Sequence, residues 1–250
     1  MKKSIKIIII IGCLAVFLYA ANGLVNIAVD YYQNSKETEE VQKKFYDTVS
    51  AEEKEEHDPH AVQPEFRDLL QENDDLVGWV NIEDTKIDYP ILHSDNNEDY
   101  LTKNFNKEYS ILGSIFMDFR NDIRTLGKNT IIYGHRTKNG SMFEHLMEYK
   151  DKEFLENHQI LQFDTLYDSY EAEVFAVYMT TTDFNYIQTD FASDEEFENY
   201  LSSVQEESIF ETDVEVSTDD IILTLSTCEE EMGNIDGRLV VQAKLMKKGQ

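Results

Sequence analysis

The sequence contains little cysteine, little proline and few basic residues. Only two cysteines occur, Cys13 and Cys228, and Cys13 lies inside a long apolar N-terminal segment. The remainder of the chain therefore holds a single cysteine, which excludes an internal disulfide there. A lone thiol of this kind is either an inert core residue or a nucleophile, because the thiolate is the reactive form of cysteine.

Basic residues are heavily outnumbered by acidic ones. The chain has 22 Lys and Arg against 50 Asp and Glu, and its formal net charge is −28. Such a surface repels nucleic acids and anionic lipid head groups, so we expect no nucleic-acid partner. No Asp-x-Asp-x-Asp-Gly calcium loop is present. We interpret the acidity as solvation of the surface, and we expect no metal and no other cofactor.

The N-terminal segment is the one long apolar run. Three lysines precede it, residues 7–29 carry no charge, and Asp30 follows. At about 1.5 Å of rise per residue, this run can cross a hydrocarbon core of about 30 Å. The lysines place residues 1–6 in the cytoplasm. We expect a cytoplasmic tail (1–6), a single-pass transmembrane signal anchor (7–29) and an extracytoplasmic remainder, with a cleaved signal peptide as the alternative.

Residues 30–64 predict a helical stalk. They are rich in Glu, Lys and Gln, and Val41, Phe45 and Val49 follow one another at intervals of four. This spacing puts the three apolar side chains on one helical face. We expect the stalk to pack on the following domain through that face.

Residues 65–250 predict one mainly β domain. After a short helix at 64–72 and apart from helical spacing at 141–158, the pattern is one of short β-type runs. They cover residues 78–82, 86–92, 113–118, 129–135, 159–165, 170–180, 221–226 and 238–246. Ser193 and Glu196 form a capping-box signature, which predicts a helix in the loop before the penultimate strand. Seven or eight short strands with few helices predict a closed or nearly closed barrel with flanking helices.

Three residues stand at the ends of predicted strands. His135 follows the run 130–133, Cys228 ends the run that begins at Ile221, and Arg238 begins the last strand. A rigid sheet displays reactive groups at such places. Each residue alone also has an ordinary interpretation: a packed thiol, a turn residue and a surface ion pair.

Together, these segments resemble the active-site motifs of sortases. Thr-Leu-Ser-Thr-Cys at 224–228, with Arg238, is similar to the signature around the nucleophile of that family. Asn-Thr-Ile-Ile-Tyr-Gly-His at 129–135, followed by Asn-Gly-Ser-Met-Phe at 139–143, is similar to the histidine segment of class B members. Ser226 and the helix near 193–206 favour class B over class A. The resemblance extends from about residue 66 to residue 247.

The resemblance implies a membrane-anchored cysteine transpeptidase with an eight-stranded β-barrel. Such enzymes cut a sorting signal near the C-terminus of a secreted protein, after its threonine. They then join the threonine to an amine of a peptidoglycan precursor. The implied location is the cell membrane of a Gram-positive-type envelope, with the catalytic domain outside.

The resemblance also implies residue roles. Cys228 attacks the threonine carbonyl, His135 exchanges protons with the leaving and incoming amines, and Arg238 donates to the carbonyl or the oxyanion. The backbone N–H of Glu229 is an oxyanion-hole candidate by its position. The positions that match the class B substrate groove are Asn97, Leu101, Thr182, Tyr186, Ile187 and Ser226.

One departure and three alternatives stay open at this point. Residues 229–231 are all glutamate, and negative charge beside Cys228 disfavours its thiolate. The alternatives are a cysteine endopeptidase in which water resolves the thioester, a pilin-polymerising sortase, and a non-catalytic surface binding module. The sequence does not specify the sorting motif or the acceptor amine.

Overall fold

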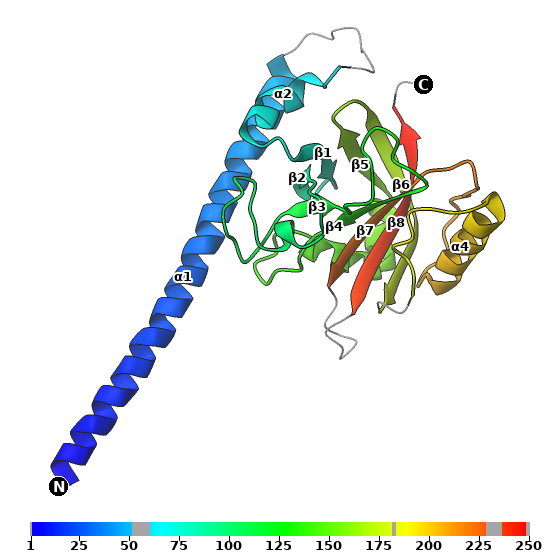
Figure 1. The fold of residues 1–250 in the computed structure, drawn as a ribbon. Coiled ribbons are helices and arrows are strands. Elements are labelled where there is room, and N and C mark those ends of the chain that lie inside the picture. The colour runs from blue at the N-terminus through cyan, green and yellow to red at the C-terminus, as the bar shows by residue number, and fades with distance from the viewer. Residues whose placement is uncertain (1, 52–60, 182–183, 229–236, 249–250) are drawn as a thin grey trace.

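The computed structural model describes residues 2–51, 61–181, 184–228 and 237–248. Its body is a closed barrel in which the neighbours run β1-β2-β3-β4-β7-β8-β6-β5 (Figure 1). The predicted closed eight-stranded barrel is therefore confirmed. The strands are β1 (Leu76–Asn81), β2 (Asp88–Leu92), β3 (Ile115–Met117), β4 (Asn129–Tyr133), β5 (Ile160–Thr165), β6 (Ser169–Thr180), β7 (Ile222–Cys228) and β8 (Arg238–Lys247).

Two of the strand pairs are parallel, and one of them determines where the functional residues lie. β2 pairs with β3, and β4 pairs with β7, in the parallel sense, whereas the other neighbours are antiparallel. In the β4–β7 pair, Asn129 is opposite Ile222 and Tyr133 is opposite Ser226. Parallel neighbours have their C-terminal ends at the same edge. The residues that follow β4 and those that end β7 therefore meet at one end of the barrel.

The barrel interior is filled by apolar side chains, and both faces of β4 and β7 are covered. The interior cluster includes Val80, Ile91, Ile132, Phe163, Val177, Leu225 and Val241. A second cluster lies under the N-terminal helices, and a third lies under the helix that precedes β7. Strands buried on both faces read as continuous apolar runs, as Ile131 and Ile132 in β4 and Ile222 and Leu223 in β7 do.

The helices follow the expected positions with one difference. α2 (Pro64–Glu72) begins with proline at its first turn, where the missing N–H costs nothing. α4 (Asp194–Glu207) lies before β7 and starts at its N-cap Ser193, whose Oγ accepts from the N–H of Glu196 at 3.2 Å. The Glu196 carboxylate accepts from Ala192 instead of completing a reciprocal capping box.

The single helix expected over 141–158 is instead two pieces. They are a 3-10 helix, η2 (Glu144–Lys150), and a short helix, α3 (Lys152–Asn157). Asp151 between them has extended backbone, and its carboxylate caps α3 by accepting from the N–H groups of Glu153 and Phe154. The cap begins a new helix, and the apolar spacing did not reveal this break.

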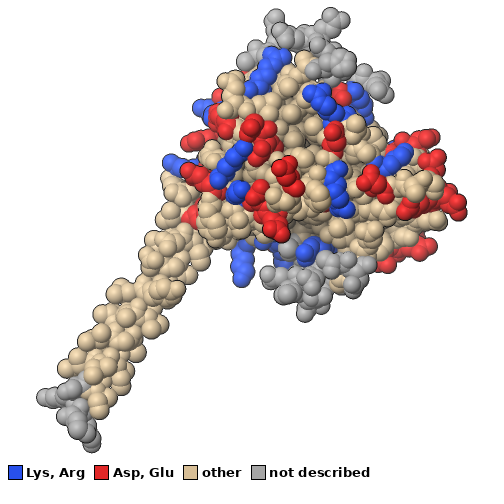
Figure 2. All heavy atoms as spheres, viewed as in Figure 1, with Lys and Arg blue, Asp and Glu red and all other residues tan. Residues whose placement is uncertain are grey.

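One continuous helix, α1 (Lys2–Ala51), contains both the predicted anchor and the predicted stalk. Its N-terminal half projects beyond the domain (Figure 1), and the side chains of the uncharged run 7–29 are mostly exposed (Figure 2). Within the described residues, α1 is the helix long and apolar enough to cross a membrane, judged by length and composition. The expected division at residue 29/30 has no structural break.

The C-terminal half of α1 packs on the barrel through the predicted apolar face. Val41 and Phe45 are buried with Phe66 and Trp79, while the side chain of Val49 lies outside the described part. The rings of Phe45 and Trp79 are stacked, with centroids 4.1 Å apart and planes inclined by 10°. An aromatic pair of this kind contributes to stability beyond its buried area.

Replacement of the stacked ring tests this packing. We expect Phe45→Ala to lower the free energy of unfolding by about 3 kcal/mol, because it leaves a cavity against Trp79. Urea unfolding of the full chain in detergent micelles, followed by Trp79 fluorescence, measures the change. Lys43→Ala on the exposed face of α1 is the control and should change little; equal losses for both variants would contradict the packing role.

Candidate active site

The ends of three neighbouring strands carry the three predicted catalytic residues. Cys228 is the last residue of β7, and the antiparallel register places it opposite Arg238, the first residue of β8. On the other side of β7, the N–H of Gly134 donates to the carbonyl of Ser226 at 3.2 Å, which extends the β4 pairing by one residue. His135 follows directly. The Cys228 side chain and Glu229 lie outside the described residues.

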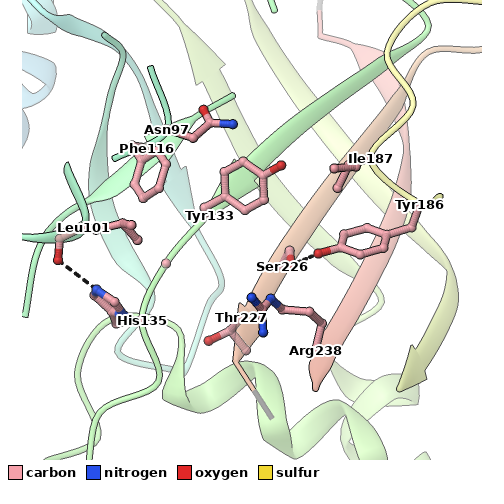
Figure 3. Close-up of a pocket in the computed structure, with 11 residues that line it drawn as sticks. Asn97, Leu101, Phe116, Tyr133, His135, Tyr186, Ile187, Ser226, Thr227 and Arg238 are labelled. Atoms are coloured by element: carbon pink, nitrogen blue, oxygen red, sulfur yellow. Dashed lines mark hydrogen bonds between the residues drawn. The ribbon is translucent and has the colours of Figure 1, made fainter. Parts of the chain in front are cut away.

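A cavity of about 250 Å³ opens at this end of the barrel (Figure 3). It contains both His135 and Arg238. Seven of the predicted site residues line it, and Thr182 lies outside the described part. The lining comprises Asn97, Leu101, Phe116, Tyr133, Gly134, His135, Tyr186, Ile187, Ser226, Thr227 and Arg238. The structure thus brings together side chains from segments that are far apart in the sequence.

His135 is held from both its backbone and its ring. Its carbonyl accepts from the N–H of Phe143 at 3.0 Å, and its Nε2 lies 2.8 Å from the carbonyl oxygen of Leu101 (Figure 3). Gly134 permits this placement, because a Cβ there would lie 2.5 Å from Ile115 and 2.7 Å from Phe143. The histidine is therefore fixed against the segment that carries Leu101.

Arg238 and Ser226 lie on adjacent strands at the floor of the cavity. The guanidinium of Arg238 lies beside Ser226 and Thr227 (Figure 3), and its Nη1 donates to the carbonyl of Gly237 at 2.9 Å. The hydroxyls of Ser226 and Tyr186 are 3.0 Å apart and share a hydrogen bond. The Thr227 hydroxyl is buried and has no hydrogen-bond partner among the residues that the structure describes. A guanidinium and three hydroxyl groups therefore lie close together at the end of β7.

A buried carboxylate, Asp118, connects three parts of the cavity lining. It is fully buried, and its oxygens accept from Asn97 Nδ2 (2.9 Å), from Tyr133 OH (2.8 Å) and from the Arg120 guanidinium at 2.7 and 2.8 Å. Arg120 Nη2 also donates to the carbonyl of Ile187 at 2.9 Å. One carboxylate thus links the segment before η1 (Asp99–Leu101), strand β4 and the loop before α4.

The electrostatics of Asp118 follow from these contacts. Burial alone would raise the pKa of its carboxyl group, but the hydrogen bonds from Arg120, Tyr133 and Asn97 outweigh burial and hold the pKa below its ordinary value. Burial, with the charge of Asp118 beside it, raises the pKa of Tyr133. Asp118 is therefore ionised and Tyr133 is a protonated donor at neutral pH.

A second polar cluster, formed by Asn129 and Tyr200, fixes the loop before α4 through its carbonyl groups. Asn129 Nδ2 donates to the carbonyls of Tyr186 (3.2 Å) and Gln188 (2.9 Å), and the Tyr200 hydroxyl donates to the Tyr186 carbonyl at 2.8 Å. With the bond from Arg120 to Ile187, three consecutive carbonyls of this loop are held. The loop therefore presents Tyr186 and Ile187 to the cavity in a defined position.

The sequence analysis missed four lining residues and the network behind them. Tyr133 and Gly134 lie inside the quoted histidine motif, and Thr227 lies inside the cysteine motif, so the signal was present. Phe116 is an apolar strand residue and gave no signal. Across the described parts of the chain, no group of three or more His, Cys, Asp or Glu could hold a metal ion.

Comparison with known proteins places this arrangement in a family. The family model "Sortase domain" matches residues 80–246. Sortase B of Listeria monocytogenes is 50% identical over 187 residues, which cover 75% of this chain and 76% of that protein. Sortase B of Staphylococcus aureus is 37% identical over 247 residues, which cover 99% of this chain and 98% of that protein.

The fold comparison agrees with the sequence comparison. A Staphylococcus aureus sortase B–substrate complex superposes with a TM-score of 0.81 at 38% identity, and the match covers 88% of this chain and 100% of that chain. A sortase B-like protein from Bacillus anthracis superposes with a TM-score of 0.79 at 45% identity, over 87% of this chain and 98% of that chain.

Replacement of the buried acid tests the network behind the cavity. Asp118→Asn leaves Arg120 without its charged acceptor, and we expect a loss of about 3 kcal/mol in the free energy of unfolding. The folded-state pKa lies below the unfolded value of about 3.9. The contribution of Asp118 is thus complete above that value and is lost as the pH falls through the folded-state pKa.

Urea unfolding of the full chain across this acidic range measures both effects. The variant should be less stable at neutral pH and should lose less stability on acidification than the wild type. Asp95→Asn, at an exposed acid nearby, is the matched control. An Asp118→Asn protein with the stability and acid dependence of the wild type would refute the assigned role.

Proposed function

The chain belongs to the sortase family and to its class B, and from this membership we propose that it cleaves a sorting signal after threonine through a thioester on Cys228. The family is one of cysteine transpeptidases of the cell envelope. The acyl group then passes to an amine of a cell-wall precursor. The substrates are secreted proteins that carry a C-terminal sorting motif.

The observation that carries this proposal is the meeting of β4, β7 and β8 at one cavity. His135 and Arg238 line that cavity, and the backbone of Cys228 lies at the end of the strand between them. A thiol can act as the nucleophile of acyl transfer, an imidazole can transfer protons, and a guanidinium can donate to the oxyanion. The end of β7 is therefore the proposed reaction centre.

In the first half-reaction, the Cys228 thiolate attacks the threonine carbonyl carbon. A C–S bond forms, the carbonyl π electrons move to oxygen, and a tetrahedral intermediate results. When the carbonyl re-forms, the C–N bond breaks and the leaving amine takes a proton from His135. The products are a thioester and the released C-terminal part of the signal.

In the second half-reaction, the incoming amine attacks the thioester carbonyl. His135 takes a proton from the amine nitrogen, the C–N bond forms, and the C–S bond breaks to release the thiolate. The chemistry is the reverse of the first step with a different amine. The number of protons on the enzyme is restored after each cycle.

The oxyanion that forms in both steps needs fixed donors. Arg238 begins β8 directly opposite Cys228, and its planar fork is the first proposed donor to the carbonyl oxygen. The backbone N–H of Glu229 follows the nucleophile and is the second proposed donor. Fixed donors help most because they need no reorganisation as charge develops.

The contact of His135 with Leu101 determines the proton position on the imidazole. A carbonyl oxygen only accepts, so Nε2, at 2.8 Å from the Leu101 oxygen, carries a hydrogen. In the neutral ring, Nδ1 is then the nitrogen that exchanges a proton with the amine. Leu101 thus orients the catalytic base in addition to lining the cavity.

The rest of the lining is proposed to bind the sorting signal. Asn97 and Leu101 line the cavity from the segment at η1, Tyr186 and Ile187 from the loop before α4, and Ser226 from the floor. Thr182 is assigned to the same groove from the family pattern. A mixed lining of apolar surface and few polar groups suits an extended peptide, and a related structure is a sortase B–substrate complex.

The apolar part of α1 is proposed to anchor the enzyme in the membrane as a single-pass helix. Residues 7–29 are uncharged and long enough to span the hydrocarbon core. The preceding lysines place residues 1–6 in the cytoplasm. The catalytic domain then lies outside, where secreted proteins and cell-wall precursors meet.

Replacement of the nucleophile is the first test. We expect Cys228→Ala in the full chain to abolish cleavage of Thr-Gly and Thr-Asn peptides and to remove the acyl-enzyme adduct that mass spectrometry detects in the wild type. Cys13→Ala removes the other cysteine and should retain full activity. Cleavage by Cys228→Ala at the wild-type rate would end the thioester mechanism.

The shape of the guanidinium supplies the second test. Lysine keeps the charge but loses the fork, so we expect Arg238→Lys to lower kcat by about 100-fold, the usual effect of losing an oxyanion donor. Steady-state peptide cleavage measures the change. Arg124→Lys, at an exposed arginine that pairs with Tyr167, is the matched control; if both variants retain wild-type kcat, Arg238 has no such role.

The fate of the thioester separates the transpeptidase from the endopeptidase alternative. With a small amine added, we expect the acyl product to shift from acid to amide as the amine concentration rises, at an unchanged rate of thioester formation. Liquid chromatography with mass detection quantifies both products. An acid product at every amine concentration would indicate a hydrolase. A preference for a lysine side chain of another sorting substrate would indicate a pilin-polymerising enzyme.

A further inference from the structure

The catalytic domain contacts α1 from the first charged residue that follows the apolar run. Asp30 Oδ2 accepts hydrogen bonds from Ser110 Oγ at 3.2 Å and from the N–H of Ile111 at 3.1 Å. The domain is therefore joined to the helix at the point where the proposed membrane span ends. The packing expected for the stalk thus extends to the residue next to the apolar run.

Further contacts fix the direction of α1 relative to the domain. Glu37 Oε1 accepts from the N–H of Asn106 at 2.8 Å, and Phe45 stacks on Trp79. From residue 30 to residue 45 the helix rises about 22 Å. Contacts distributed over this length hold the domain against α1 and prevent it from swinging about a single point.

The segment that touches Asp30 is a small lobe, residues 102–111. Its two sides are joined by the bridge between Lys103 and Tyr109 and by the bond from the N–H of Ser110 to the carbonyl of Thr102 (3.0 Å). The side chains that flank Ser110 are large and apolar in character. Tyr109 is 74% exposed and Ile111 is 39% exposed.

Ile111 lies beside Asp30, the residue that follows the proposed membrane span, and Tyr109 is two residues away along the chain. Tyr32, two residues beyond Asp30 on α1, is also exposed. Tyrosine is enriched at membrane–water interfaces because its ring is apolar and its hydroxyl is polar. An apolar residue beside it can enter the same region, so the Tyr109–Ile111 side of the 102–111 lobe, next to Asp30, matches the interfacial layer of a bilayer.

We propose that the 102–111 lobe rests in the interfacial layer of the outer leaflet, with Tyr109 and Ile111 among the lipid head groups. The proposal rests on the membrane anchoring proposed above. The net charge of −28 opposes attraction to an anionic surface, so burial of apolar area supplies the contact. A zwitterionic bilayer therefore suffices.

The position of the lobe brings the candidate active site to the membrane surface. The lobe follows directly after η1, whose Leu101 lines the cavity and accepts from His135. Ser114, after the lobe, bonds back to the carbonyls of Tyr100 and Lys103. Leu101, directly before the lobe, lines the cavity, so a lobe that touches lipid brings the cavity close to the bilayer.

Fluorescence quenching by lipid tests the proposal on the full chain. The protein has one tryptophan, Trp79, which is buried under α1. Tyr109→Trp adds an exposed probe on the side of the lobe next to Asp30. The variant is reconstituted into vesicles of phosphatidylcholine or of dibrominated phosphatidylcholine. We expect its added emission to be blue-shifted and to be lost with the brominated lipid.

Ile209→Trp is the matched control. Ile209 is 39% exposed, as Ile111 is, and it follows α4, which lies on the side of the barrel opposite α1 (Figure 1). Its emission should be the same in both lipids. Circular dichroism and urea unfolding establish that each variant is folded before quenching is measured.

Flotation of the vesicles separates the two proposals. Co-flotation together with selective quenching of Tyr109→Trp supports the docked lobe. Co-flotation with equal emission of Tyr109→Trp in both lipids overturns the docked lobe and leaves the anchor intact. A folded protein that does not float with the vesicles overturns the anchor, and the docked lobe with it.

Discussion

The parallel pairing of β4 with β7 is the constraint on which the candidate site depends. Parallel strands require a long connection, and here β5, β6 and α4 form it. This connection returns the chain to β4 in the same direction, so the residues after Tyr133 and those at the end of β7 share one edge. β8 then comes back antiparallel, which sets Arg238 opposite Cys228. The strand register therefore brings together candidate catalytic residues that are about a hundred residues apart in the sequence.

The cavity lining is held mainly by buried polar groups. Asp118 and Arg120 fix one side, and Asn129 with Tyr200 fixes the other, through carbonyls of the same loop. Burying such groups costs free energy unless each finds its partners. Once satisfied, they give the lining fewer alternative arrangements than apolar packing would. A peptide that binds there meets a surface that is already ordered, which lowers the entropic cost of binding.

Most of the barrel could be predicted from the sequence because each strand is a short apolar run with clear ends. The candidate catalytic residues could be predicted for the same reason. They stand where those apolar runs end, inside motifs that resemble a known family. The role of Asp118 could not be predicted from the sequence. In a chain with 50 acidic residues, a carboxylate after a short strand looks like surface charge, and only the fold shows that Arg120, Tyr133 and Asn97 surround it.

The break at Asp151 was missed because apolar spacing does not report backbone conformation. The packing of α1 through Val41 and Phe45 was predicted from their spacing, whereas the bonds from Ser110 and Ile111 to Asp30 were not, because they depend on residues distant in the sequence.

The contact at Asp30 also has a kinetic consequence. With the proposed anchor in place, a catalytic domain joined to α1 without a flexible linker stays close to the membrane, so it meets its partners in a thin layer by lateral diffusion. The rate at which it meets a partner then follows the number of molecules per unit area, not their bulk concentration. A partner retained in the same bilayer is met far more often than one that has diffused away, and selection between them arises before any side chain in the cavity is touched.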